Sequence, residues 1–137
     1  MKKILLVLLT MVSIFSYSAQ AADWMFYYEN DDGISFVDLD SIHYLTKYIA
    51  RVWIKNIHSD AYRNYLVKNY GTKYQDDAYT LYLGEFNCEY REWRALEYTT
   101  YAKDGRVIVS GNKPTEWLKL PSASPLNPIF KIICERR

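Results

Sequence analysis

The 137-residue sequence contains none of the short motifs that mark common catalytic or ion-binding sites. It has no G-x-S-x-G, no H-E-x-x-H, no glycine-rich phosphate loop and no EF-hand pattern. Its two histidines, His43 and His58, have no ligand-like spacing to each other or to either cysteine. The sequence therefore predicts a protein that is not an enzyme and that uses no metal and no cofactor.

An apolar run long enough to span a membrane is also missing. Residues 4–15 are mostly apolar, but a membrane-spanning helix needs about 20 such residues, which argues against an uncleaved anchor. Two lysines precede this run, and Ala19 and Ala21 occupy positions −3 and −1 of an A-x-A cleavage site. We therefore predict a cleaved signal peptide over residues 1–21, with Ala22 as the mature N-terminus.

No cysteine lies near the predicted cleavage site, so the sequence offers no attachment point for a lipid. The expected protein is exported, is periplasmic or extracellular (including the cell surface), and is not lipid-anchored. After removal of the signal it is expected to contain no transmembrane helix.

The expected mature chain also lacks an excess of positive charge. Cleavage leaves residues 22–137, with 15 basic and 16 acidic side chains, because residues 1–21 hold two lysines and no acidic residue. Binding to nucleic acid requires a clear excess of Lys and Arg, so nucleic acid is not an expected partner. The 116 remaining residues are enough for one hydrophobic core, and we predict a single domain.

Cysteine is scarce, and the two that occur are Cys88 and Cys134. An even count in an exported chain is typical of disulfide bonding, and two cysteines allow one intramolecular pair. Closing this loop would stabilise the fold by about 4 kcal/mol in the chain-entropy account.

Aromatic residues are abundant, at 17% of the chain, with fourteen tyrosines and four tryptophans. Tyrosine favours pleated, half-buried surfaces, so a tyrosine-rich sheet is the simpler interpretation. Tyrosine and tryptophan are also enriched in binding interfaces, which is the second interpretation.

Most of the mature chain reads as β-strand. A hairpin is expected from residues 24–29 and 34–39 around a run of turn formers, and a β-bulge is expected within residues 88–92. Asp104-Gly105 predicts a two-residue hairpin turn. The six predicted strands are residues 24–29, 34–39, 46–57, 78–87, 93–102 and 106–110.

The strand at residues 46–57 has the clearest alternation. Its core face is predicted to carry Tyr48, Ala50, Val52 and Ile54, and its other face Lys47, Ile49, Arg51, Trp53 and Lys55. Arg51, Trp53 and Lys55 form the candidate ligand-binding site, suited to an acidic protein patch or an anionic glycan. The alternative is an ordinary solvated face, with Trp53 packed under a neighbouring helix or a dimer partner.

Two segments have helical spacing. Residues 59–70 carry tyrosines and a leucine at helical intervals, Ser59 or Asp60 can cap the start, and Gly71 can end the segment, which predicts a short helix or an ordered loop. Near the C-terminus, Leu126, Ile129 and Ile133 form one apolar stripe that ends beside Cys134. We therefore expect a C-terminal helix that a Cys88–Cys134 disulfide ties to the sheet.

Several short motifs resemble those of the surface-adhesin protein E family. They are Phe36-x-Asp38-x-x-Ser41-Ile42, Tyr82 with Asn87-Cys88, a tyrosine-rich hairpin closing on Gly105, and Ile132-Ile133-Cys134. The resemblance spans most of the mature chain. It implies an α+β fold, namely a six-stranded antiparallel sheet with a C-terminal helix tied to it by the disulfide.

The resemblance also implies a function. It predicts an adhesin-like binding module that forms a homodimer and binds host matrix or serum proteins such as vitronectin, laminin and plasminogen. The alternative is a periplasmic envelope protein, acting as an inhibitor or assembly factor.

Overall fold

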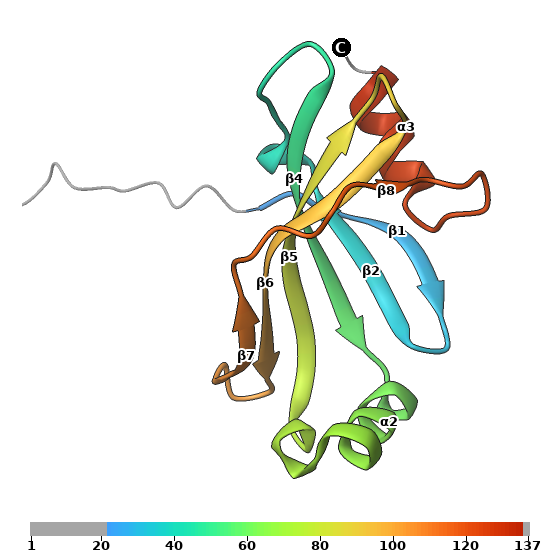
Figure 1. Cartoon of the computed structure of the whole chain (residues 1–137). Helices are drawn as coiled ribbons and strands as arrows, with labels where there is room; N and C mark the ends of the chain where they lie inside the picture. The colour runs from blue at the N-terminus through green and yellow to red at the C-terminus, as the bar shows by residue number, and fades with distance from the viewer. Residues whose placement is uncertain (1–21, 136–137) are drawn as a thin grey trace, which may run out of the picture.

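The structure is a computed structural model that describes residues 22–135. The predicted signal peptide, with Ala19 and Ala21, lies outside the described residues. The described chain forms one curved antiparallel sheet with a helix near each end of it (Figure 1).

Six long strands make up the body of the sheet, as the sequence predicted, and two short strands extend it. In their order across the sheet, the six are β1 (Trp24–Asn30), β2 (Gly33–Asp38), β4 (Ile49–His58), β5 (Asp77–Asn87), β6 (Glu92–Ala102) and β7 (Val107–Gly111). The short strands are β3 (His43–Tyr44), which pairs with β4, and β8 (Leu118–Lys119), which pairs with β6. Every pairing is antiparallel.

The predicted helix after the longest alternating segment is confirmed as α2 (Asp60–Tyr70). Ser59 caps it, because its hydroxyl accepts a hydrogen bond from the Tyr62 amide at 3.1 Å. Gly71 follows with a φ of 103°, a conformation that L side chains rarely adopt, and the helix ends there. Two single-turn helices, η1 (Leu39–Ser41) and η2 (Thr72–Tyr74), complete the connections.

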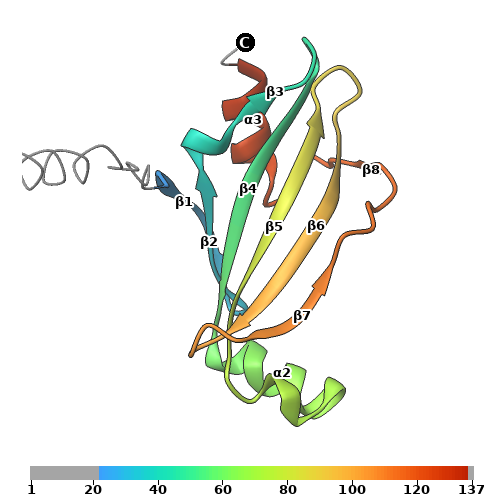
Figure 2. The ribbon, with the colours of Figure 1, turned by 90° about the vertical axis from the view of Figure 1, so that its left-hand side faces the viewer.

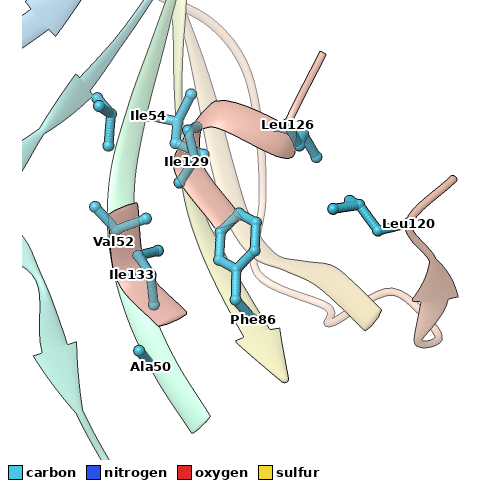
Figure 3. Packing of buried hydrophobic residues seen from close by; sticks show 9 residues of the cluster. Ala50, Val52, Ile54, Phe86, Leu120, Leu126, Ile129 and Ile133 are labelled. Carbon is cyan, nitrogen blue, oxygen red and sulfur yellow. The ribbon is translucent and has the colours of Figure 1, made fainter. Parts of the chain in front are cut away.

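The C-terminal helix α3 (Asn127–Glu135) lies across one face of the sheet, whereas α2 lies beyond the end of the strands (Figure 2). The α3 side chains Ile129 and Ile133 are fully buried and point toward the strands (Figure 3). The residues that they meet on β4 and β5 are Ala50, Val52, Ile54 and Phe86, all with 0% exposure. The predicted core face of the central strand is therefore confirmed, except that Tyr48 precedes β4 and is partly exposed.

The predicted disulfide is present between Cys88 and Cys134, with a Cα–Cα distance of 5.6 Å. It joins the last turn of α3 to the connection between β5 and β6. A second tie comes from β3, where the Tyr44 hydroxyl donates a hydrogen bond to the Ile133 carbonyl at 2.6 Å. This bond satisfies one of the carbonyls that the end of a helix leaves without an intrahelical partner.

The bulge predicted within residues 88–92 is wrong. Residues 88–91 form the turn between β5 and β6, and the Asn87 side-chain oxygen accepts hydrogen bonds from the amides of Glu89 and Tyr90. The shift in apolar phase that suggested a bulge is therefore caused by a chain reversal. The register shifts of this hairpin lie within the paired strands instead, one of them where Leu83 and Gly84 of β5 pair with Glu97 and Ala95 of β6.

The two-residue turn predicted at Asp104-Gly105 is also wrong, because the loop has three residues. The Ala102 amide donates to the Arg106 carbonyl at 2.8 Å, and the Gly105 amide donates to the Ala102 carbonyl at 3.0 Å. Gly105 has a φ of 86°. A turn followed by a left-handed glycine is the usual three-residue hairpin, and sequence alone does not separate it from the two-residue form.

Candidate functional site

The sheet has two faces of different character. We call the side covered by α3 the helix face and the opposite side the outer face, which is the side of β4 that carries Arg51, Trp53 and Lys55. Alternation along the strand separates these three residues from the buried Ala50, Val52 and Ile54. Each of the three is partly exposed.

Arg51 is paired with a carboxylate on the neighbouring strand. Its Nε donates to Oε2 of Glu85 at 2.7 Å, while Arg94 on β6 approaches the other oxygen at 2.7 Å. The Glu85 side chain is only 3% exposed, so it needs both cations. The Arg94 guanidinium in turn lies 4.5 Å from the centre of the Trp117 ring. Arg51 therefore contributes to the fold as well as to the charge of the outer face.

Lys55 lies between two aromatic rings. Its ammonium nitrogen is 4.9 Å from the centre of the Tyr79 ring on β5 and 5.4 Å from the centre of the Trp24 ring on β1. Both distances are within the range of cation–π attraction. The rings hold the charge at a defined position on the outer face, whereas lysine side chains at protein surfaces are usually mobile.

Trp53 lies between these two cations on β4. Among the described residues, the core cluster around α3 does not include it, so it does not pack under that helix. Its backbone amide donates to the Ser41 hydroxyl at 2.9 Å, and its register partner on β5 is Leu83. The aromatic surface continues along the sheet to Phe36 and Phe26, whose rings meet edge-on at 6.1 Å. Phe26 is 52% exposed.

A pocket of about 400 Å³ opens on the helix face, and the sequence analysis did not predict it. Its aromatic lining comes from four elements, β1, α2, β5 and β6, and consists of Tyr27, Tyr28, Tyr62, Tyr82 and Trp93. Its polar lining consists of Asn30, Asp32, Ser35, Asn56, His58 and Ser124. These residues are spread over nearly 100 positions of the chain, and only the strand order of the sheet brings them together.

The wall of the pocket contains a network of neutral polar groups. The Ser35 hydroxyl donates to the Asn56 side-chain oxygen at 2.9 Å. Burial raises the pKa of Tyr27, and hydrogen bonds with Ser35 and Tyr82 lower it by less. Burial is the main cause that raises the pKa of Tyr82 well above its ordinary value of 10.0, and the nearby Tyr27 raises it further. Both hydroxyls therefore lose their protons only at a higher pH than an exposed tyrosine does.

His58 lines the same pocket, and contacts with Asp77 and Thr80 fix its side chain. Its Nδ1 lies 2.6 Å from Oδ2 of Asp77, a fully buried carboxylate, and its Nε2 lies 3.3 Å from the Thr80 hydroxyl. The Tyr62 ring of α2 packs edge-on against the imidazole, with 4.9 Å between ring centres. These contacts give the His58 ring one orientation at the pocket wall.

Burial is also the main cause that raises the pKa of Tyr62, with smaller contributions from the carboxylates of Asp32 and Asp77 and from two neighbouring tyrosines. Across residues 22–135, no group of three or more His, Cys, Asp or Glu side chains gathers where it could hold a metal ion. Within the same range, no helix is long and apolar enough to cross a membrane.

The sequence model of the surface-adhesin protein E family matches residues 24–135, which is nearly all of the described chain. The chain belongs to this family. Family membership supports a surface adhesin, and with it an exported protein at the cell surface whose role is binding. Comparison with the curated proteins finds no match.

Two solved structures share the fold of this family member. The structure of Haemophilus influenzae protein E is 15% identical in sequence, with a TM-score of 0.56 over 82% of this chain and 84% of that one. A second crystal form of Haemophilus influenzae protein E is 14% identical, with a TM-score of 0.55 over 82% of this chain and 87% of that one. At this level of identity the likeness establishes the fold alone.

The motifs that suggested the family have clear roles in this fold. The Asp38 carboxylate accepts hydrogen bonds from the amides of Asp23 and Asp40, both at 3.1 Å. The Ser41 hydroxyl donates to the Asp38 carbonyl and accepts from the Trp53 amide. These hydrogen bonds hold the segment between β2 and β3 in place beside β4. The family motif therefore specifies the sheet that supports the outer face.

Proposed function

We propose that this family member is an exported adhesin that binds a host matrix or serum protein, with vitronectin, laminin and plasminogen as candidates, through its outer face. The observation that carries the proposal is the position of Lys55 between the rings of Tyr79 and Trp24, next to Trp53 on the same strand. Fixed aromatic and cationic groups of this kind are typical of the central residues of protein interfaces.

The charge of the outer face favours an acidic partner. Arg51 and Arg94 share the carboxylate of Glu85, and Lys55 adds a third positive charge. Glu97, the register partner of Leu83, adds a second negative charge, so these groups together leave one positive charge over. A surface of this sign speeds the approach of an acidic protein patch, whereas the desolvated ring of Trp53 would supply most of the affinity.

We also propose that the protein acts as a homodimer. The outermost strands β1 and β7 each have one long edge without a strand partner among the described residues. Val107 on β7 is 51% exposed. Pairing of such edges between two copies would remove an aggregation risk and leave the outer face of each copy free. Two copies would also bind an extended matrix protein with higher avidity than one.

Adherence of intact bacteria tests this function. A strain without the protein should adhere less to surfaces coated with vitronectin or laminin, and the wild-type gene should restore adherence. Lys55→Glu and Trp53→Ala should fail to restore it at equal surface amounts, measured by antibody labelling. Lys68→Glu makes the same charge change on the exposed side of α2 and serves as the matched control.

Protease treatment of intact cells separates the adhesin from the alternative. If the protein is protected on intact cells and its loss leaves adherence unchanged, the adhesin proposal is refuted. A periplasmic envelope role would then replace it.

A further inference from the structure

The pocket on the helix face has the size and construction of a ligand site. Its volume of about 400 Å³ falls within the range of about 300–1,000 Å³ found for small-molecule sites. The segment that leads into α3 (Ser124 to Leu126) forms one wall, and the disulfide and the core fix the helix that follows. The pocket also lies on the side of the sheet opposite Arg51, Trp53 and Lys55.

The lining combines two kinds of surface. Tyr27, Tyr28, Tyr82 and Trp93 supply aromatic rings, while Ser35 and Asn56 supply a hydroxyl and an amide between them. A ligand that complements both must carry hydroxyl or amide groups around its rim and apolar C–H groups on its faces. A pyranose ring has this arrangement, because its hydroxyls point outward and its axial hydrogens form an apolar patch that packs on an aromatic face.

The charge of the pocket points to a neutral ligand. Among the described residues that line it, none is Lys or Arg, and Asp32 is the one carboxylate. Asp32 is exposed, at the turn between β1 and β2, and so lies toward solvent. A phosphate, sulfate or carboxylate group would enter such a pocket without a cation to pair with.

His58 is a fixed part of the same wall, because both of its ring nitrogens have partners within the protein. The buried carboxylate of Asp77 holds Nδ1, and the Thr80 hydroxyl lies near Nε2, so the imidazole cannot turn away. Asp77 is itself fully buried, and its other oxygen has no hydrogen-bond partner within the described chain. His58 therefore shapes the wall, and the directed polar groups beside it are the Asn56 amide and the Ser35 hydroxyl, which fix each other through their hydrogen bond.

We propose that this pocket binds a neutral saccharide, one or two sugar units long, with Ser35 and Asn56 facing its hydroxyls and Tyr28 packing on its C–H face. This is a second binding site, which goes beyond the proposed recognition of a host protein by the outer face. It would let the same protein attach to a glycan, either on a glycoprotein or on a cell surface.

A titration followed by NMR tests the proposal on the folded domain. The ¹⁵N-labelled protein is titrated with glucose, galactose, N-acetylglucosamine, maltose and lactose, and separately with choline chloride and inorganic phosphate. At least one sugar should shift the amide signals of Ser35, Asn56 and their neighbours in a saturable way, with half-saturation below about 50 mM. Choline and phosphate should not.

Matched variants then locate the site. Asn56→Ala removes hydrogen bonds to the sugar and should weaken binding by about fivefold, and Tyr28→Ala should weaken it by a similar factor. Asn69→Ala on α2 and Tyr90→Ala in the β5–β6 turn change the same residue types on exposed surface and should leave the affinity unchanged. Dispersed amide spectra establish that each variant is folded.

Three results would overturn the proposal. The first is the absence of any saturable shift with the five sugars. The second is sugar binding that both pocket variants leave intact, which would place the site elsewhere. The third is saturation of the pocket signals by choline or phosphate in place of a sugar, which would assign the pocket to a charged ligand. Loss of host-protein binding in the outer-face variants is a separate outcome, since those residues do not line the pocket.

Discussion

At the scale of single residues, Glu85 is the buried charge on which the outer face depends. Its carboxylate accepts from Arg51 and Arg94, and it is almost completely shielded from water. We expect Glu85→Ala to lower the free energy of unfolding by about 2–3 kcal/mol, because two partly buried guanidinium groups would then face each other without a counter-charge.

Urea denaturation measures this loss of stability. Glu89→Ala, which removes an exposed carboxylate from the adjoining turn, is the control and should change stability little. A loss below about 0.5 kcal/mol in the Glu85 variant would mean that water already screens the two arginines.

Tyr82 makes stability depend on alkaline pH. Its folded-state pKa lies above the ordinary value of 10.0, so the folded chain keeps a proton that the unfolded chain loses. The stability from this group is therefore complete below pH 10 and is lost as the pH rises toward the raised folded-state value. Tyr27 acts in the same direction.

We expect Tyr82→Phe to cost about 1 kcal/mol at pH 7, through the lost hydrogen bond with Tyr27, and to flatten the decline above pH 10. Urea denaturation at a series of pH values compares it with Tyr90→Phe, an exposed control. Equal slopes in the wild type and Tyr82→Phe would show that Tyr82 does not cause the decline.

The alternation of a single strand was sufficient to predict that Arg51, Trp53 and Lys55 share a face. It could not predict their partners. Glu85 and Arg94 meet Arg51 only through the pairing register of β4, β5 and β6, and that register depends on tertiary contacts. Arg51 therefore looked like a free surface cation in the sequence, whereas it holds a buried carboxylate in the fold.

At the scale of elements, α3 depends on both packing and a covalent bond. Ile129 and Ile133 fill the core, and Cys134 is bonded to Cys88 across a sequence separation of 46. Replacing both cysteines by Ser should destabilise the domain by about 2–5 kcal/mol, because the unfolded chain is no longer constrained.

Chemical denaturation of the double variant and of the reduced wild type should give matching losses. Peptide mass spectrometry without reduction should show one Cys88–Cys134 link. Equal stability of the oxidised wild type and the double variant would mean that packing alone holds α3 in place.

Elements with strong local signals were predictable and those with competing signals were not. Ser59 caps the start of α2 and Gly71 ends it, and both signals are local in the sequence. The sequence therefore located that helix within one or two residues. The β5–β6 turn was mistaken for a bulge because the apolar phase shifts across residues 88–92, and a chain reversal causes the same shift. The turn depends on one side chain, that of Asn87, which accepts two backbone hydrogen bonds.

At the scale of the whole molecule, the pocket shows the limit of sequence reasoning. Tyr27 and Leu126 both line it although almost 100 residues separate them. No periodicity or local motif in the sequence predicts that two residues so far apart line the same pocket. The residues that carried the family resemblance, such as Asp38 and Ser41, stabilise the sheet, so the resemblance identified the fold more directly than the ligand.

Dimerisation is the prediction that belongs to the intact molecule in solution. Multi-angle light scattering at micromolar concentration should give about twice the mass of the 116-residue chain, because two exposed sheet edges favour pairing between copies. A strictly monomeric mass up to high concentration would remove the homodimer from the account.

The central claim is that the outer face binds a host protein. Surface plasmon resonance of the folded domain on immobilised vitronectin and laminin tests it most directly, with Trp53→Ala, Lys55→Glu and the control Lys68→Glu in parallel. We predict binding that weakens as salt rises, a loss of about tenfold or more for Trp53→Ala, a smaller loss for Lys55→Glu, and no change for Lys68→Glu. Unchanged affinity in both folded outer-face variants, or no binding by the wild type, would contradict the claim.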